Sequence, residues 1–164
     1  MPMKLSTKVI KVLLINVFMA FALSVVATAL GLISAGFSGE TFWRAYLPAV
    51  GLNFLLAYVI SFFVGMFIPS EAWGFAFAQS RGVKPTDGLK FGMLINVVVN
   101  TVFTLVNALI LTYVNAILLQ GAPLSSYLGA LIGCFIPCWV VGFLVSLPWA
   151  PKAEKIARSI TKDC

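Results

Sequence analysis

Long uncharged, apolar stretches alternate with short charged segments along this chain. No Asp, Glu, Lys or Arg occurs from Val12 to Gly39, from Ala45 to Ser70 or from Phe91 to Pro151, which are 28, 26 and 61 residues long. A helix that crosses a bilayer core of about 30 Å needs roughly 20 apolar residues. The first two stretches each have room for one such helix, and the third has room for two with a break at Gln120–Pro123. The predicted helices cover 12–35, 45–68, 91–119 and 126–148.

The apolar stretches favour helices over the strands of a membrane barrel. They are long and continuously apolar, and they lack the strict alternation of a lipid-facing strand. Composition points the same way, because 61% of the 164 residues are hydrophobic and only 10% are charged. Soluble domains carry about 25% charged residues. We therefore expect an all-α membrane protein with four transmembrane helices.

One pattern occurs twice, 80 residues apart: Leu13-Leu14-Ile15-Asn16 returns as Met93-Leu94-Ile95-Asn96. Further pairs at this offset lie on one helical face, namely Ala20/Asn100, Ser24/Thr104, Ala27/Asn107, Gly31/Leu111 and Ala35/Asn115. The chain is therefore predicted to contain two tandem helical hairpins, residues 1–82 and 83–164. Hairpins of equal orientation are parallel repeats about an axis along the membrane normal, so the matching faces of the first and third helices are expected to meet.

The distribution of positive charge predicts the orientation. Ten of the eleven Lys and Arg residues precede the first helix, separate the second from the third or follow the fourth, and only Arg44 lies in an opposite loop. The positive-inside rule then predicts a multi-pass protein of the cell inner (plasma) membrane with both termini cytoplasmic.

An alternative exists for the first apolar segment. Three lysines, an apolar run and Ala27-Thr28-Ala29 resemble a secretory signal with its cleavage site. The segment matches the third helix, however, and its apolar run continues beyond Ala29. A retained first helix is therefore the favoured interpretation.

The third predicted helix carries a polar face. Its four asparagines and one threonine fall within an arc of about 100°, at about 100° per residue. An amide in hydrocarbon leaves its donors and acceptors unpaired at a cost of several kcal/mol, at order of magnitude, so this face must lie against protein or water. Together with the matching face of the first helix, the candidate site is Asn16, Ser24, Asn96, Asn100, Thr104, Asn107 and Asn115.

Two interpretations of this face remain open. The asparagines can be interhelical contacts, which is the favoured interpretation because membrane helix interfaces commonly use such side chains. They can instead line a pathway for a small solute. The expected function is accordingly structural or accessory and non-enzymatic, with a small-solute transporter or channel, acting as an oligomer, as the alternative.

Other residues predict packing rather than chemistry. The chain has no His, and its five acidic residues lie outside the uncharged stretches, so we expect no enzyme, no cofactor and no metal site. Small residues at four-residue spacing predict tight crossings, and Cys134 and Cys138 are expected to pack as small residues. After Pro148 the pattern fits either a short amphipathic helix on the membrane surface or a solvated tail with stop-transfer charges. The small residues are Ala57, Ser61 and Gly65 in the second helix and Gly129 and Gly133 in the fourth.

Each half resembles the small bacterial two-helix membrane proteins of the domain of unknown function 2798 family. The similar features are a first helix with Ser, Thr or Asn, a short aromatic outer loop and a second helix that ends on proline. The resemblance implies a bacterial inner membrane and no established activity. The expected partners are the lipid bilayer and either a second copy or a larger membrane protein, but no nucleic acid. The residues concerned are Ser24, Thr28, Thr104 and Asn107, then Phe42–Tyr46, then Pro69 and Pro148.

Overall fold

The computed structural model describes residues 3–162, and within them all regular secondary structure is helical. Four helices are long and apolar enough to cross a membrane: Leu5–Ser34, Gly39–Phe67, Leu89–Leu119 and Leu124–Thr161. They contain α1 (Leu5–Ser34), α2 (Gly39–Phe67), α4 (Leu89–Thr112) with the π-helical segment Tyr113–Leu119, and α5 (Tyr127–Thr161). Between α2 and α4 lie α3 (Ser70–Ser80) and the short turn Pro85–Asp87. The prediction of four long apolar helices is confirmed.

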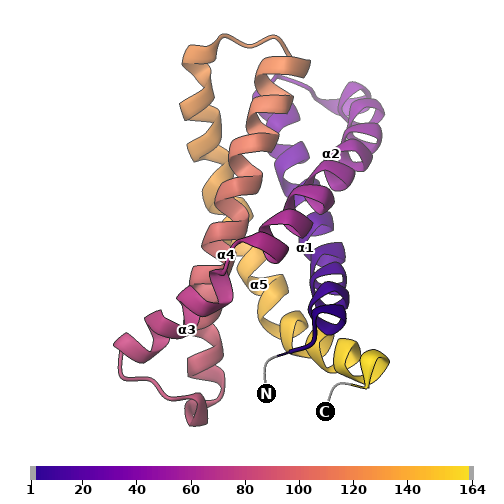
Figure 1. The fold of residues 1–164 in the computed structure, drawn as a ribbon. Coiled ribbons are helices and arrows are strands. Elements are labelled where there is room, and N and C mark those ends of the chain that lie inside the picture. Colours follow the sequence, from indigo (N-terminus) through magenta and orange to yellow (C-terminus); the bar gives the residue numbers. More distant parts are fainter. Residues whose placement is uncertain (1–2, 163–164) are drawn as a thin grey trace.

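The helices form one bundle with two distinct ends (Figure 1). The start of α1, the end of α5 and α3 lie at one end, called here the terminus end, and the α1–α2 and α4–α5 connections lie at the other, the loop end. The hydroxyl groups of Thr7 and Thr161 are 2.7 Å apart and join α1 to α5 at the terminus end. α1 packs mainly against α5 and α2, and α4 packs mainly against α5 and α3. Ala20 of α1 and Leu111 of α4 belong to one small core cluster, but the extensive packing expected between the matching faces of α1 and α4 is not found.

The bundle has a small-residue and polar interior with large apolar side chains outside. Ala20, Ala57 and Ser61 are fully buried, whereas Leu55 and Phe63 on the same helix as Ala57 are more than half exposed. Because lipid is as apolar as leucine, membrane helices gain little from burying leucine and associate through close packing and polar contacts. Gly65 of α2 is one such close contact, since a Cβ atom there would lie 2.8 Å from Cγ1 of Val12.

α5 differs from the prediction. It does not end near Pro148 but runs through Pro148 and Pro151 as one helix to Thr161. A proline removes one helical hydrogen bond and pushes the preceding turn away, yet α5 continues as a helix past both prolines and packs extensively on α1. The residues after Pro148 are helical and continue α5, with Ala153 and Ala157 buried and Ile156 and Ile160 exposed.

α3 folds back along α4 at the terminus end. Ser70, Gly74 and Ala78 recur every four residues on its buried face. A Cβ atom on Gly74 would lie 2.8 Å from the backbone oxygen of Ile95, so only glycine allows this approach. Trp73 and Phe75 remain exposed, which agrees with a surface segment.

Candidate functional site

The predicted polar face of α4 points into the bundle. Asn100, Thr104 and Asn107 are each about 1% exposed, and Asn96 is also buried. These positions follow helical spacing, so a single helix orientation buries all of them at once. Asn115, in the π-helical segment, is half-buried.

Two asparagines of α4 hold α5. Asn96 donates from Nδ2 to the Phe143 oxygen at 3.3 Å and accepts at Oδ1 from the Ser146 hydroxyl at 2.9 Å. Asn100 donates from Nδ2 to the Trp139 oxygen at 2.8 Å. Both asparagines thus donate a hydrogen bond to a backbone carbonyl of α5. The two bonds lie one turn apart on each helix.

The other two asparagines hold α2. Asn107 donates from Nδ2 to the Ser61 hydroxyl at 2.8 Å. Asn115 and Asn53 each donate to the other, with Nδ2–Oδ1 distances of 2.9 and 3.2 Å. Asn53 also donates to the Thr28 hydroxyl of α1 at 2.8 Å. Asn53 therefore links α2 both to α1 and to the π-helical segment.

The two candidate residues of α1 behave differently from those of α4. The Ser24 hydroxyl donates to the Ala20 oxygen of its own helix at 2.6 Å. Asn16 is fully buried, yet its Nδ2 and Oδ1 atoms have no hydrogen-bond partner among residues 3–162. In α4, the buried Oδ1 atom of Asn107 also has no hydrogen-bond partner among residues 3–162. Two buried amides are thus incompletely paired.

Two cavities lie along the polar face. The loop-end cavity has a volume of about 530 Å³, and the terminus-end cavity has a volume of about 730 Å³. The pairs Ala27/Asn107, Gly31/Leu111 and Ala35/Asn115 line the first, and Asn16/Asn96 and Ile15/Ile95 line the second. The matching faces of α1 and α4 therefore line common cavities instead of packing on each other.

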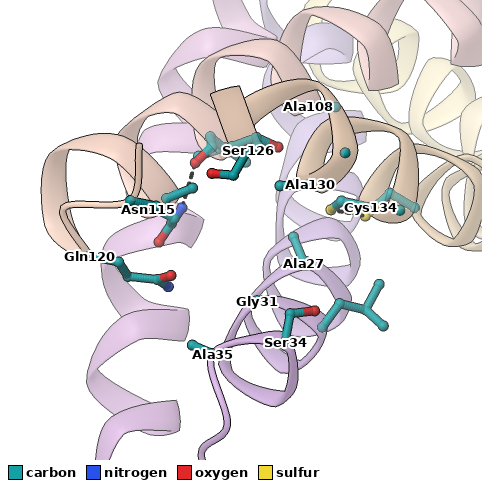
Figure 2. A pocket seen from close by; sticks show the side chains of 18 of the residues that line it. Ala27, Gly31, Ser34, Ala35, Ala108, Asn115, Gln120, Ser126, Ala130 and Cys134 are labelled. Carbon is teal, nitrogen blue, oxygen red and sulfur yellow. Dashed lines mark hydrogen bonds between the residues drawn. The ribbon is translucent and has the colours of Figure 1, made fainter. Parts of the chain in front are cut away.

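Small side chains form much of the loop-end cavity. Figure 2 shows Ala27 and Gly31 of α1 facing Ala130 and Cys134 of α5, with Asn115 and Gln120 to one side. Gly129 and Gly133 also line this space, and nothing lies within 4 Å of a Cβ atom built on either. The tight crossing predicted at these two glycines is therefore wrong within residues 3–162, because no helix of this part approaches that face closely.

A closely packed region separates the cavities. Met19 and Asn100 line the terminus-end cavity, whereas Leu23 and Thr104, one turn further along α1 and α4, line the loop-end cavity. A Cβ atom on Gly142 of α5 would lie 2.6 Å from Asn100 Oδ1 and 3.3 Å from the Met19 terminal carbon. Met19, Asn100 and Gly142 thus close the space between α1, α4 and α5.

The sequence does not predict an ion cluster that surrounds the buried Lys11 at the terminus end. Lys11 is 8% exposed, and its Nζ atom lies 2.8 Å from Glu71 of α3 and 3.0 Å from Glu154 of α5. Arg158 also binds Glu154, at 3.0 Å. From the sequence, Lys11 counts only among the positive charges that predict the orientation, although Glu71 and Glu154, which follow Pro69 and Pro151, are a signal for ion pairing.

The cysteines and acidic residues offer no metal site among residues 3–162, since no three metal-ligand side chains cluster there. The sulfur atoms of Cys134 and Cys138 are 3.5 Å apart and both residues are free thiols. Comparison with known proteins gives no match to a family model, a curated protein or a solved structure. The site therefore consists of a polar network that joins helices and of two cavities that lie beside this network.

Proposed function

We propose that the chain is a non-enzymatic integral membrane protein with a structural or accessory role, and that its asparagines hold the bundle together. The observation that carries this proposal is that Asn96, Asn100, Asn107 and Asn115 all donate hydrogen bonds to another helix. Two of them bind α5 and two bind α2. In lipid, such contacts and close packing replace the hydrophobic effect between helices.

The proposal extends to location and family. The protein resides in a bacterial inner membrane with both termini cytoplasmic, and it is a tandem form of the domain of unknown function 2798 family. Support for the orientation comes from charge: ten of eleven cationic side chains belong to segments at the terminus end, and Arg44 belongs to the loop end (Figure 1). Support for the tandem form comes from the 80-residue offset of the paired residues.

A second candidate function is a channel or transporter for a small uncharged solute, acting as an oligomer. It is favoured by the two cavities, which lie on either side of Met19 and Asn100. Movement of the flexible Met19 side chain would connect them. The asparagines would then serve both as helix contacts and as part of the wall.

Solute flux into proteoliposomes separates the two candidates. Glycerol and urea entry is followed by light scattering, with empty liposomes and the lipid-facing variant Leu55→Ala as controls. The structural role predicts the rate of empty liposomes for the wild type and for Met19→Ala. Transport predicts faster entry, a further increase in Met19→Ala and a loss in the folded variant N100L/N107L.

Purification from native membranes tests the accessory role itself. Native mass spectrometry of the affinity-purified chain is expected to show a second copy or a second membrane protein in stoichiometric amount. A monomer without any partner, together with solute flux, would contradict the structural or accessory role and leave the transport proposal.

A further inference from the structure

We propose that the terminus-end cavity binds an uncharged, largely apolar molecule whose single primary amide or hydroxyl group pairs with Asn16. The cavity volume of about 730 Å³ falls within the range of sites for small organic molecules. This binding site goes beyond the structural role proposed above and does not depend on it.

Asn16 is the observation that points to a ligand. It lies in the cavity wall, it is fully buried, and both its Nδ2 and Oδ1 atoms are unpartnered among residues 3–162. A buried amide without hydrogen bonds destabilises the protein. Asn96 and Asn100, in the same wall, both have partners on α5. A ligand that bonds to Asn16 removes the one fully unpaired amide of this cavity.

The chemistry of Asn16 defines the polar group of the ligand. Its Nδ2 atom offers two donors and its Oδ1 atom is an acceptor, so the best partner both donates and accepts. A primary amide or a hydroxyl group meets this requirement. The reciprocal pair of Asn53 and Asn115 gives the geometry within this same protein, at 2.9 and 3.2 Å.

The remaining wall defines the body of the ligand. Most of the side chains that line the terminus-end cavity are apolar, which favours an alkyl or similar chain. Val12, Ile15, Phe75, Val99, Phe103 and Leu147 are among them.

Charge argues for a neutral ligand. Lys11 lines the cavity, but its ammonium group is already balanced by Glu71 and Glu154. Lys8, also in the wall, donates from Nζ to the Met66 oxygen at 3.0 Å. The Asn16 amide is uncharged, so it offers no counter-charge to a carboxylate or an amine bonded to it, whereas a neutral polar group needs none.

Two probes of nearly equal shape test the site. Radiolabelled decanamide is titrated onto the full chain in phosphatidylcholine–phosphatidylglycerol nanodiscs, and empty nanodiscs correct for partitioning into lipid. N,N-dimethyldecanamide, which accepts but cannot donate a hydrogen bond, is the competitor. The wild type is expected to bind one decanamide per chain and to bind the dimethyl compound about tenfold more weakly.

Variants assign the effect to Asn16 and to the cavity. Asn16→Leu keeps the branched shape of the side chain and is expected to bind both compounds equally. Ser24→Ala is the matched control, because Ser24 is buried on the same helix, bonds its own backbone and is expected to keep the preference. Gly92 also lines the cavity and a Cβ atom there meets nothing within 4 Å, so Gly92→Leu has room to occupy part of the cavity and should weaken binding of both compounds.

Equal binding of the two compounds by the wild type would overturn the proposal, and so would an unchanged preference in Asn16→Leu. Undiminished binding in Gly92→Leu would place the ligand elsewhere and would equally overturn it. None of these outcomes bears on solute flux or on protein partners, so the structural role is judged independently.

Discussion

Asn53 of α2 and Asn115 of the π-helical segment exchange two hydrogen bonds, with Nδ2–Oδ1 distances of 3.2 and 2.9 Å. The pair lies beside the loop-end cavity, since Asn115 contributes to its wall. It joins the first hairpin to the second where α2 and the end of α4 meet. No other side-chain pair described for residues 3–162 bonds in both directions in this way.

Loss of one member of this pair is expected to destabilise the bundle. Asn115→Leu should lower the free energy of unfolding by about 1–2 kcal/mol, because it removes the exchange and leaves the Asn53 oxygen unpaired. Unfolding in mixed micelles by increasing sodium dodecyl sulfate measures the change. The double variant N53L/N115L should lose less than the sum of the two single variants. Strict additivity would show that the two amides are not coupled.

Lys11 is expected to matter more than either of its partners. Lys11→Met removes both ion pairs and should lower the free energy of unfolding by about 1–2 kcal/mol, a value below that of fully buried pairs because both carboxylates reach water. Glu71→Gln should change it by less than about 0.5 kcal/mol, since Glu71 is 64% exposed and Lys11 keeps Glu154. The same micelle titration applies. A larger loss in Glu71→Gln than in Lys11→Met would contradict this order.

Two glycines of α5 give opposite expectations for the same substitution. Gly142→Ala places a Cβ atom 2.6 Å from Asn100 Oδ1, so Asn100 must move and its bond to Trp139 weakens. We expect a loss of about 1–3 kcal/mol from this overpacking. Gly133→Ala meets nothing within 4 Å and should be neutral or stabilising by up to about 1 kcal/mol through helix propensity. Thermal unfolding of both purified variants, compared with the wild type, is the measurement.

The proposed orientation predicts which end of the bundle is labelled in intact cells. Ser38→Cys at the loop end and Ser80→Cys at the terminus end are both exposed sites. In a background without native cysteines, a membrane-impermeant maleimide should label Ser38→Cys in whole cells and Ser80→Cys only after permeabilisation. Labelling of Ser80→Cys in intact cells would reverse the orientation.

The sequence predicts the helices and the inward asparagine face because both follow from one-dimensional patterns. Uncharged stretches locate the spans, and the spacing of Asn100 and Asn107 fixes which side of α4 is buried. The partners of these residues depend on how helices cross, which periodicity does not contain. Asn100 therefore binds a backbone oxygen of α5, whereas Asn107, two turns away, binds Ser61 of α2.

Other features lie outside what the sequence pattern can predict. Pro148 favours the end of a helix through its local effect, but α5 continues beyond it as a helix that packs on α1. No residue type marks the π-helical segment Tyr113–Leu119, because it needs one extra residue in a turn rather than a special side chain. The pairing of Lys11 with Glu71 and Glu154 spans most of the chain and is visible only once α3 and α5 are placed.

The contact between Thr7 and Thr161 brings the start of α1 close to the end of α5 at the terminus end. The connection between α3 and α4, which contains Gly82, lies at the same end. A short flexible peptide could therefore join the end of α5 to the start of α1. New chain termini placed at Gly82 would interrupt no helix. In such a circularly permuted chain, the helices α4 and α5 would be synthesised before α1 and α2. Its assembly would reveal whether either half must enter the bilayer before the other.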